Sequence, residues 1–326
     1  MHAGLPLNDR RILALCPDWT FPSGGVRKIY RHVEVLNALG YRAFVGHQAA
    51  GFRCKWFKSN APIAEAGKNW PPDPNGDILV CPEFVAWQMV QTTPGLPKVI
   101  FNQGAYLTFQ GMKEKFTSPP YESDEFLGTI VVSQDSQAYL NYAFPKHRTL
   151  RIHNAIDPSL FFPVQNKRRR IAYMPRKMSA DARQVIAILQ HHRSLDGFEV
   201  VAIENLTELQ TAEMLRDSMI FLNFCSQEGS PVPPLEAMAS GCLVIGYDGQ
   251  GGREYLNDHL AIRVAEEDIL GFVKAIEAAI AGFRNTPGLM TQKTKRALSF
   301  VTEMHSPRRE RHDIAQAWQQ LLMPIT

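Results

Sequence analysis

Two glutamates frame a loop that is rich in glycine and proline. Glu228 and Glu236 are separated by seven residues in EGSPVPPLE, directly after the apolar run Phe221–Phe224. Pro233 and Pro234 suit the first turn of a helix, where a missing N–H costs nothing. The stretch therefore predicts a strand, a loop and a short helix with one carboxylate at each end of the loop.

The loop between the two acids offers backbone amides to an anion. Gly229, Ser230 and Val232 carry free N–H groups at the expected positive end of the helix, whereas Pro231 has none. Carboxylates beside an anion site can accept hydrogen bonds from hydroxyls. The combination predicts a site for a phosphorylated sugar, such as a nucleotide-sugar.

The rest of the chain reads as alternating strands and helices in two halves. A glycine-rich turn containing Gly24 and Gly25 separates the strand Arg11–Cys16 from a helix of about Val26–Leu39. This opening lacks the full G-x-G-x-x-G pattern, which argues against a dinucleotide-binding dehydrogenase. The alternation predicts an α/β protein with two parallel-sheet domains. We expect the first domain at residues 1–163, the second at 164–305 and a final helix at 306–326.

Composition excludes several classes of protein. The 326 residues carry a net charge of +3, too small to predict nucleic-acid binding, and the five cysteines form no CxxC pair. Neither a signal peptide nor a membrane-spanning run is present, so a cytoplasmic protein is expected.

Residues 51–60 mix aromatic and basic side chains. They predict either a peripheral contact at the inner face of a membrane or a partly buried loop.

The stretch EGSPVPPLEAMASGCLVIG resembles the signature of retaining GT-B glycosyltransferases of family four, the glycosyl transferases group 1. The resemblance implies two Rossmann-like domains whose parallel sheets face each other across a cleft. It also implies that the final helix returns to the first domain.

The resemblance assigns a role to each motif. Glu228 would act at the donor sugar and Glu236 would bind the nucleotide ribose, while Gly229, Ser230, Pro231 and Val232 would lie against the diphosphate. Arg176 matches the position of a cation on that diphosphate, and either Lys177 or Arg183 would be the second one. Gly24 and Gly25 would face the donor phosphate and the acceptor. Many relatives carry a histidine where this sequence has Asn102 and Gln103, whose amides can bind sugar or acceptor hydroxyls.

We therefore expect a retaining hexosyltransferase that uses a nucleotide-sugar, by family habit a UDP-sugar, without a cofactor. No Asp-x-Asp motif is placed to hold a metal on the diphosphate, so cationic side chains would replace it. The acceptor would be a glycan or a lipid-linked sugar in surface glycan or glycolipid synthesis. Two alternatives are a GT-B sugar-nucleotide epimerase and a catalytically silent nucleotide-sugar-binding protein.

Overall fold

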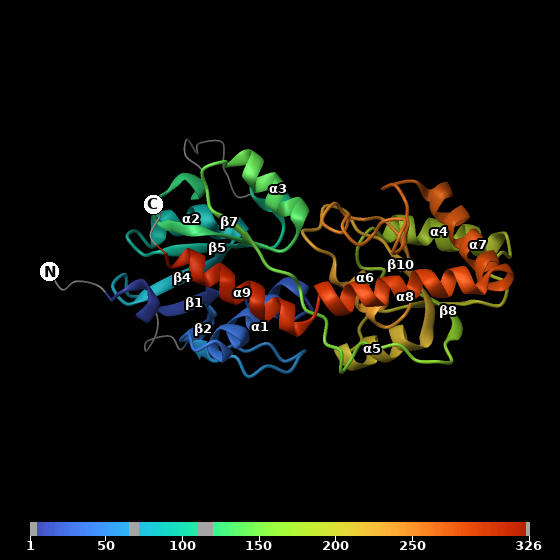
Figure 1. The fold of residues 1–326 in the computed structure, drawn as a ribbon, viewed down its shortest axis with the longest axis horizontal. Helices are drawn as coiled ribbons and strands as arrows, with labels where there is room; N and C mark the ends of the chain where they lie inside the picture. Colours follow the sequence, from blue (N-terminus) through green and yellow to red (C-terminus); the bar gives the residue numbers. More distant parts are fainter. Residues whose placement is uncertain (1–4, 65–71, 110–119, 324–326) are drawn as a thin grey trace. The chain divides into compact units, whose positions relative to one another are not determined.

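The computed structural model describes residues 5–64, 72–109 and 120–323, and the chain divides into two compact units (Figure 1). The first unit contains Met1–His153 with Glu310–Thr326, and the second contains Asn154–Arg309. The sequence predicts boundaries after residues 163 and 305 instead. The first boundary lies earlier because Ile156 and Phe161 are buried in the core of the second unit. The second lies later than predicted, at Arg309/Glu310.

The first unit is built on a seven-stranded parallel sheet with the strand order β3-β2-β1-β4-β5-β6-β7. The central strand β4 is buried at every position, as expected for a parallel sheet that is covered on both faces. The strands are β1 (Arg11–Leu15), β2 (Ala43–Gly46), β3 (Ile63–Ala64), β4 (Asp77–Pro82), β5 (Lys98–Asn102), β6 (Phe126–Val131) and β7 (Thr149–Arg151).

Two pairs of helices cover this sheet. Helices α1 (Gly24–Ala38) and α9 (Pro307–Leu321) pack on one face, and α2 (Ala86–Thr92) and α3 (Gln134–Ala143) pack on the other. The described part of the unit also contains the short 3-10 helices η1 (Leu7–Asp9), η2 (Glu83–Val85), η3 (Ala105–Leu107) and η4 (Pro120–Glu122).

Helix α9 belongs to the core of the first unit although it comes last in the sequence. Ile314, Trp318 and Leu321 are fully buried in the same cluster as the strands β1 and β4. At the start of the helix, the Lys28 ammonium contacts Glu310 Oε1 at 2.5 Å, and both side chains are buried.

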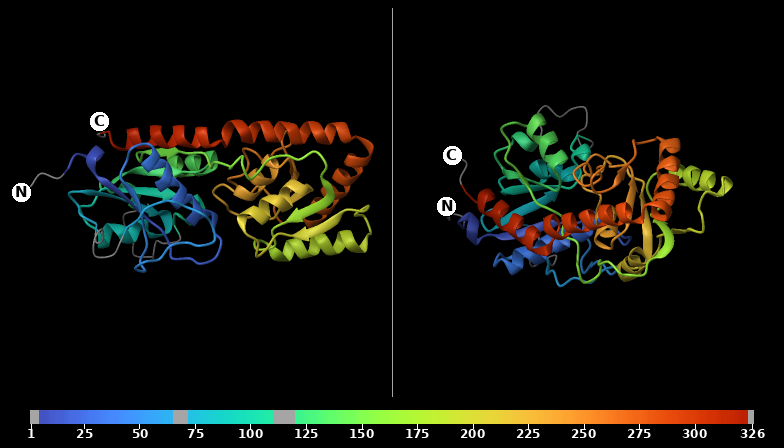
Figure 2. Two further views of the ribbon diagram at one scale, coloured as in Figure 1. Left: turned by 90° about the horizontal axis from the view of Figure 1, so that it is seen from below. Right: turned by 45° about the vertical axis from the view of Figure 1, so that its right-hand side comes forward.

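The second unit is built on a five-stranded parallel sheet with the order β12-β11-β10-β8-β9. Helices α5 (Glu208–Asp217), α6 (Val232–Ala239) and α8 (Pro287–Met304) cover one face, and α4 (Ser179–His191) and α7 (Ile269–Asn285) cover the other (Figure 2). The strands are β8 (Arg168–Tyr173), β9 (Glu199–Ala202), β10 (Ser218–Asn223), β11 (Leu243–Gly246) and β12 (Ile262–Arg263).

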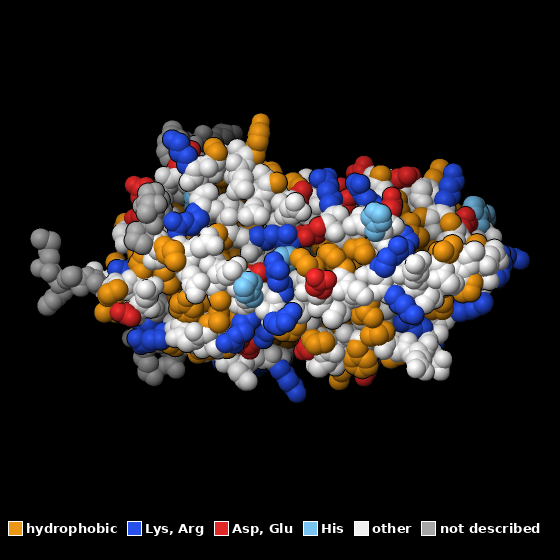
Figure 3. Space-filling model, in the orientation of Figure 1, with side chains coloured by type: hydrophobic (Ala, Val, Ile, Leu, Met, Phe, Trp, Pro, Cys, Tyr) orange, Lys and Arg blue, Asp and Glu red, His pale blue; other side chains and the backbone are white. Residues whose placement is uncertain are grey.

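The prediction of two parallel-sheet α/β units is confirmed. Among the strands of the described residues, the sequence missed β3 and β12, which have two residues each and are too short to show a period. Across the described ranges, no helix is long and apolar enough to cross a bilayer. On the face drawn in Figure 3, Lys and Arg side chains are spread among acidic and apolar ones, in keeping with the small net charge.

Candidate functional site

The site residues of the second unit lie at the point where the order of its strands reverses. From β8 the chain goes to β9 on one side, and then to β10 on the other side. Because all strands are parallel, the loops after β8 and β10 leave from the same edge. Ligands of open α/β sheets bind outside the carboxyl ends of strands at such a reversal. Arg176 and Lys177 follow β8, and Glu228 follows β10.

Lys177 and Glu228 contact each other directly, as the Lys177 ammonium forms an ion pair with Glu228 Oε1. The Lys177 side chain is 47% exposed and that of Glu228 is 22% exposed, so a ligand can reach both. Desolvation and the neighbouring charge of Arg176 lower the pKa of Lys177. Two of the predicted catalytic residues are thus brought together within the second unit.

Of the two candidates for a second cation, Lys177 is the one that contacts Glu228. Arg183 lies on α4, and its guanidinium donates to Ser179 Oγ at 3.4 Å. Arg176 and Lys177 are both exposed in the turn between β8 and α4, beside the loop of Glu228.

The loop from Gly229 to Val232 presents the amides that the sequence predicts. Helix α6 begins at Val232 after Pro231, with proline in its first turn. Among the described residues, the amides of Gly229 and Ser230 have no hydrogen-bond acceptor. The Ser230 hydroxyl is also buried without a partner. Two free amides and a hydroxyl at a helix start form a site for an anion.

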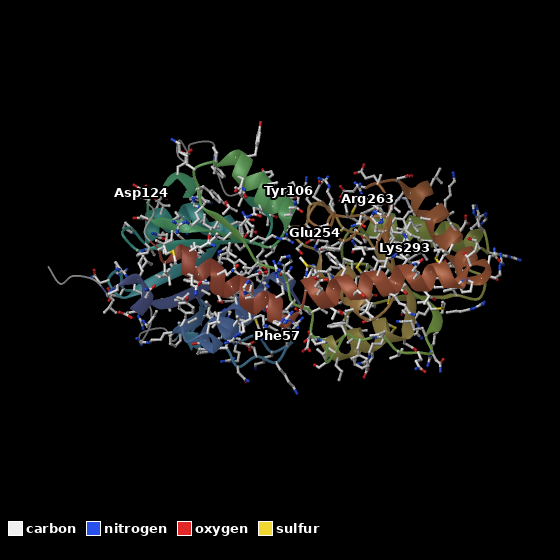
Figure 4. The ribbon with its side chains drawn as sticks, viewed as in Figure 1. Phe57, Tyr106, Asp124, Glu254, Arg263 and Lys293 are labelled. Carbon is white, nitrogen blue, oxygen red and sulfur yellow. The ribbon has the colours of Figure 1, made fainter. Side chains whose placement is uncertain are left out.

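A second turn, at Gly249–Gly252, fixes the conformation of this loop. The Glu228 amide donates to the Gly249 carbonyl at 2.8 Å, and the Gly251 amide donates to the Glu228 carbonyl at 3.0 Å. The turn is held in place by Asp248, whose carboxylate accepts from the Gln250 amide at 2.8 Å and lies 2.7 Å from Nε of Arg263. Figure 4 labels Arg263 among the side chains of the second unit. Three glycines within four residues are the sequence signal that marks this turn.

Gly251 is the residue where the two turns come closest. A Cβ at this position would lie 2.0 Å from the Gly229 carbonyl oxygen, which no small shift can relieve. We therefore expect Gly251→Ala to displace the loop, lower the melting temperature by roughly 5 °C or more and reduce activity. Gly288→Ala is the control because a Cβ there meets no atom within 4 Å. Equal melting temperatures and activities for the two variants would contradict the close packing of the turns.

Glu236 lies on α6 and is 8% exposed. Its position on the helix that starts at the loop keeps it in the second unit with Glu228. Beneath the loop, burial raises the pKa of Cys225 to about 12, so this thiol stays neutral. The five cysteines are all free and buried.

The first unit places the other predicted residues at the corresponding edge of its own sheet. Helix α1 begins at Gly24, and the Gln103 side-chain amide donates to the Gly25 carbonyl at 3.1 Å. A Cβ at Gly24 would meet open space, and neither glycine has a positive φ. Internal packing therefore does not require these two glycines.

Asn102 differs from Gln103 in its surroundings. It is fully buried, and its side-chain amide donates to Thr108 Oγ1 and to the Tyr121 hydroxyl, both at 3.0 Å. The structure thus brings Gly25 and Gln103 together, and it places Asn102 in a network inside the unit.

Comparisons with known proteins agree with this arrangement. Residues 182–281 match the family described as Glycosyl transferases group 1, and this span includes Glu228, Glu236 and the loop between them. An α-1,6-glucosyltransferase of Actinobacillus pleuropneumoniae serotype 7 is 26% identical over 239 residues, which is 70% of this chain and 70% of the relative. The chain is thus similar to the group 1 glycosyltransferases over residues 182–281, and to a glucosyltransferase over 70% of its length.

Solved structures share the GT-B fold of this chain. A glycosyltransferase from Rickettsia africae has a TM-score of 0.69 at 14% identity, and the match covers 98% of this chain and 100% of that chain. Sucrose-phosphate synthase from Thermosynechococcus elongatus has a TM-score of 0.67 at 14% identity, covering 96% and 99%. HepE of Anabaena in complex with UDP-glucose has a TM-score of 0.66 at 12% identity, covering 95% and 99%.

Proposed function

We propose that this glycosyltransferase moves a hexose from a UDP-sugar to an acceptor hydroxyl, with retention of the anomeric configuration and without a metal ion. The observation that carries the proposal is the meeting of Lys177, Glu228 and the free amides of Gly229 and Ser230 at one strand reversal. A diphosphate needs positively charged or N–H groups to bind it. The hydroxyls of the attached sugar need a hydrogen-bond acceptor beside those groups. HepE, which has the same fold, has been solved with UDP-glucose, which supports the choice of nucleotide.

In this proposal the cations act on the leaving group. The bond between the anomeric carbon and the phosphate oxygen breaks, and negative charge grows on the diphosphate. Arg176, Lys177 and the two loop amides stabilise that charge, which is the main catalytic term that such a site supplies. The acceptor oxygen bonds to the anomeric carbon from the same face, and its proton passes to a phosphate oxygen.

The two acids have separate tasks. Glu228 accepts from hydroxyls of the donor sugar and orients its anomeric carbon. Its ion pair with Lys177 keeps the ammonium at the site, and an ammonium has three protons with which to serve both the carboxylate and a phosphate oxygen. Glu236 holds the ribose hydroxyls.

We further propose that the acceptor is a glycan or a lipid-linked sugar and that it binds beside Gly25 and Gln103. A lipid-linked acceptor would bring the protein to the face of a membrane. Aromatic residues of 51–60 are packed in the structure, since Trp56 and Phe57 lie against the core of the first unit. This packing favours the partly buried loop over a direct membrane contact by those rings.

The first test is a thermal-shift screen with UDP-glucose, UDP-galactose, UDP-N-acetylglucosamine, GDP-mannose, dTDP-glucose and ADP-glucose. We expect a UDP-sugar to stabilise the protein most, because a ligand at a hundred times its dissociation constant adds about 2.7 kcal/mol. Stabilisation by GDP-mannose or ADP-glucose alone would overturn the assignment of the base.

The donor found in the screen is then incubated with oligosaccharide and lipid-linked acceptors, with and without EDTA. We expect product with the donor's anomeric configuration in both samples. Loss of activity in EDTA with rescue by Mg²⁺ or Mn²⁺ would contradict the metal-independent reaction. Conversion of the donor to an epimer without an acceptor would indicate the epimerase instead. Tight donor binding with no turnover on any acceptor would indicate a silent binding protein.

A further inference from the structure

Glu83 lies at the strand reversal of the first sheet, and it belongs to none of the motifs in the sequence. The chain goes from β1 to β2 on one side and later to β4 on the other, so the reversal lies between β1 and β4. Glu83 directly follows β4, and Gly25 lies in the first turn of α1. Ligands bind at such points in open α/β sheets.

The Glu83 carboxylate is held by the backbone that follows β5. The Gln103 amide donates to Glu83 Oε2 at 3.2 Å, and a Cβ on Gly104 would lie 3.5 Å from Glu83 Oε1. Gln103 in turn donates through its side chain to the Gly25 carbonyl at 3.1 Å. Glu83, Gln103 and Gly25 therefore form one continuous chain of contacts along the edge of the sheet.

This carboxylate is buried without a compensating charge. Glu83 is 4% exposed, and among the described residues it makes no ion pair. Desolvation raises its pKa from 4.5 to about 7, although backbone amides including those of Gln103 and Gly104 act in the opposite direction. The titratable groups on the surrounding elements are Cys81 on β4, Lys98 on β5, Tyr106 on η3 and Tyr121 on η4.

These four groups do not control the ionisation of Glu83, because each is either paired with another residue or neutral near pH 7. Lys98 is occupied by Glu125 at 2.7 Å and by the carbonyls of Thr93 and Leu96. The Tyr106 hydroxyl donates to Asp135 at 2.7 Å. Burial raises the pKa of Cys81 to about 12, and burial also raises that of Tyr121. Neither group gains a charge near pH 7.

We propose that Glu83 is a positioning residue for glycosyl transfer: its ionised carboxylate fixes the backbone at Gln103 and thereby holds the Gln103 side chain against Gly25. A carboxylate accepts from amides more strongly than a carboxylic acid does. Protonation of Glu83 therefore loosens the edge, and transfer depends on its ionised form. This inference rests on the proposed function, because it takes Gly25 and Gln103 to be beside the acceptor.

The folded protein loses stability when Glu83 ionises, and this loss is itself an argument that the ionised form serves activity. A buried carboxyl whose pKa is raised on folding contributes stability below about pH 4.5, and that stability is lost as the pH rises through about 7. The proposal requires the ionised form of Glu83, and the folded protein is less stable when Glu83 is in that form. Removing the charge with Glu83→Gln should stabilise the protein at pH 8 relative to the wild type, while lowering its activity.

The kinetic test measures kcat/KM for the acceptor between pH 5.5 and 9, since this ratio reports groups that titrate in the free enzyme. For the wild type we expect a rise of roughly tenfold from pH 6 to pH 8 through an apparent pKa near 7. Glu83→Gln should lack this rise and remain at the low level. Glu122→Gln, an exposed residue of the same unit, is the control and should match the wild type. An unchanged profile in Glu83→Gln would overturn the proposal.

A second test needs no turnover. The amide signals of Gln103 and Gly104 in ¹⁵N-labelled protein should titrate with a midpoint near pH 7, and Glu83→Gln should abolish that titration. If Glu83→Gln does not fold, Gln103→Ala keeps the carboxyl and removes the link to Gly25; its backbone amides should still titrate while kcat/KM falls. Absence of titration at both amides in the wild type would overturn the proposal. Absence of transfer with every donor, despite the titration, would overturn the proposed function and leave the ionisation of Glu83 established.

Discussion

Glu228→Gln should lower kcat by roughly a hundred- to a thousandfold, the loss that follows removal of one stabilising group at a reacting centre. The substitution keeps the shape of the side chain but removes the charge at the donor sugar. It also removes the carboxylate that pairs with the Lys177 ammonium. Affinity for free UDP, measured by calorimetry, should change little, because the nucleotide does not contain the sugar.

Glu236→Gln should give the opposite result. The proposed partners of Glu236 are ribose hydroxyls, which are present equally in the ground state and the transition state. Loss of such uniform binding raises KM and leaves kcat nearly unchanged. UDP affinity should fall in the calorimeter.

Steady-state kinetics on both variants separate the two roles. Glu277→Gln is the control, because Glu277 lies on α7 in the same unit and, among the described residues, its ion-pair partner is His192 at 3.8 Å. A Glu228 variant with normal kcat and weak nucleotide binding, together with a Glu236 variant of the reverse behaviour, would mean that the two assignments are exchanged. If neither variant differs from the control, the loop is not the donor site.

Arg176→Ala and Lys177→Met should each reduce both donor affinity and kcat, with a combined loss in kcat/KM of roughly ten- to a hundredfold. A hydrogen bond to a charged group contributes about 1.5–3 kcal/mol. Part of that is gained only as charge builds on the leaving diphosphate, so kcat falls together with affinity. Lys177→Met has a further effect, because Glu228 then lacks the ammonium that contacts it.

Arg183→Ala is the matched control for both cation variants. Arg183 is exposed on α4, in the same unit and close to the site in sequence, and it carries the same charge as Arg176. We expect its kinetics to equal those of the wild type. A loss in Arg183→Ala as large as that in Lys177→Met would show that the diphosphate extends toward α4. Unchanged kinetics in all three variants would move the diphosphate to another part of the chain.

The sequence predicted the fold well because both halves carry strong local signals. Buried strands such as β4 contain continuous apolar runs, here Ile78–Cys81, and the α1 positions Val26, Ile29, Val33 and Leu36 follow the helical period. The helix after Glu228 was predicted from its prolines, which stand in the first turn of α6. These features depend on neighbours in the sequence, so they can be read without the tertiary structure.

Other features depend on contacts between distant segments. The turn at Gly249–Gly252 supports the loop after Glu228 through backbone hydrogen bonds, which no side-chain pattern reveals. No sequence pattern marks Glu83, because its carboxylate meets the loop after β5, twenty residues later. The assignment of residues 154–163 to the second unit was missed for the same reason, since Ile156 and Phe161 find their partners only in the folded core.

The order in which a ribosome makes this chain differs from the order in which its first unit can fold. Trp318 and Leu321 fill the core of a unit whose strands were all synthesised before residue 154. At about 5–20 residues per second, the intervening segment takes on the order of ten to thirty seconds to emerge. During that time the face that α9 covers is without its apolar partner. An apolar face that stays uncovered in this way offers chaperones a surface to bind until α9 has been synthesised.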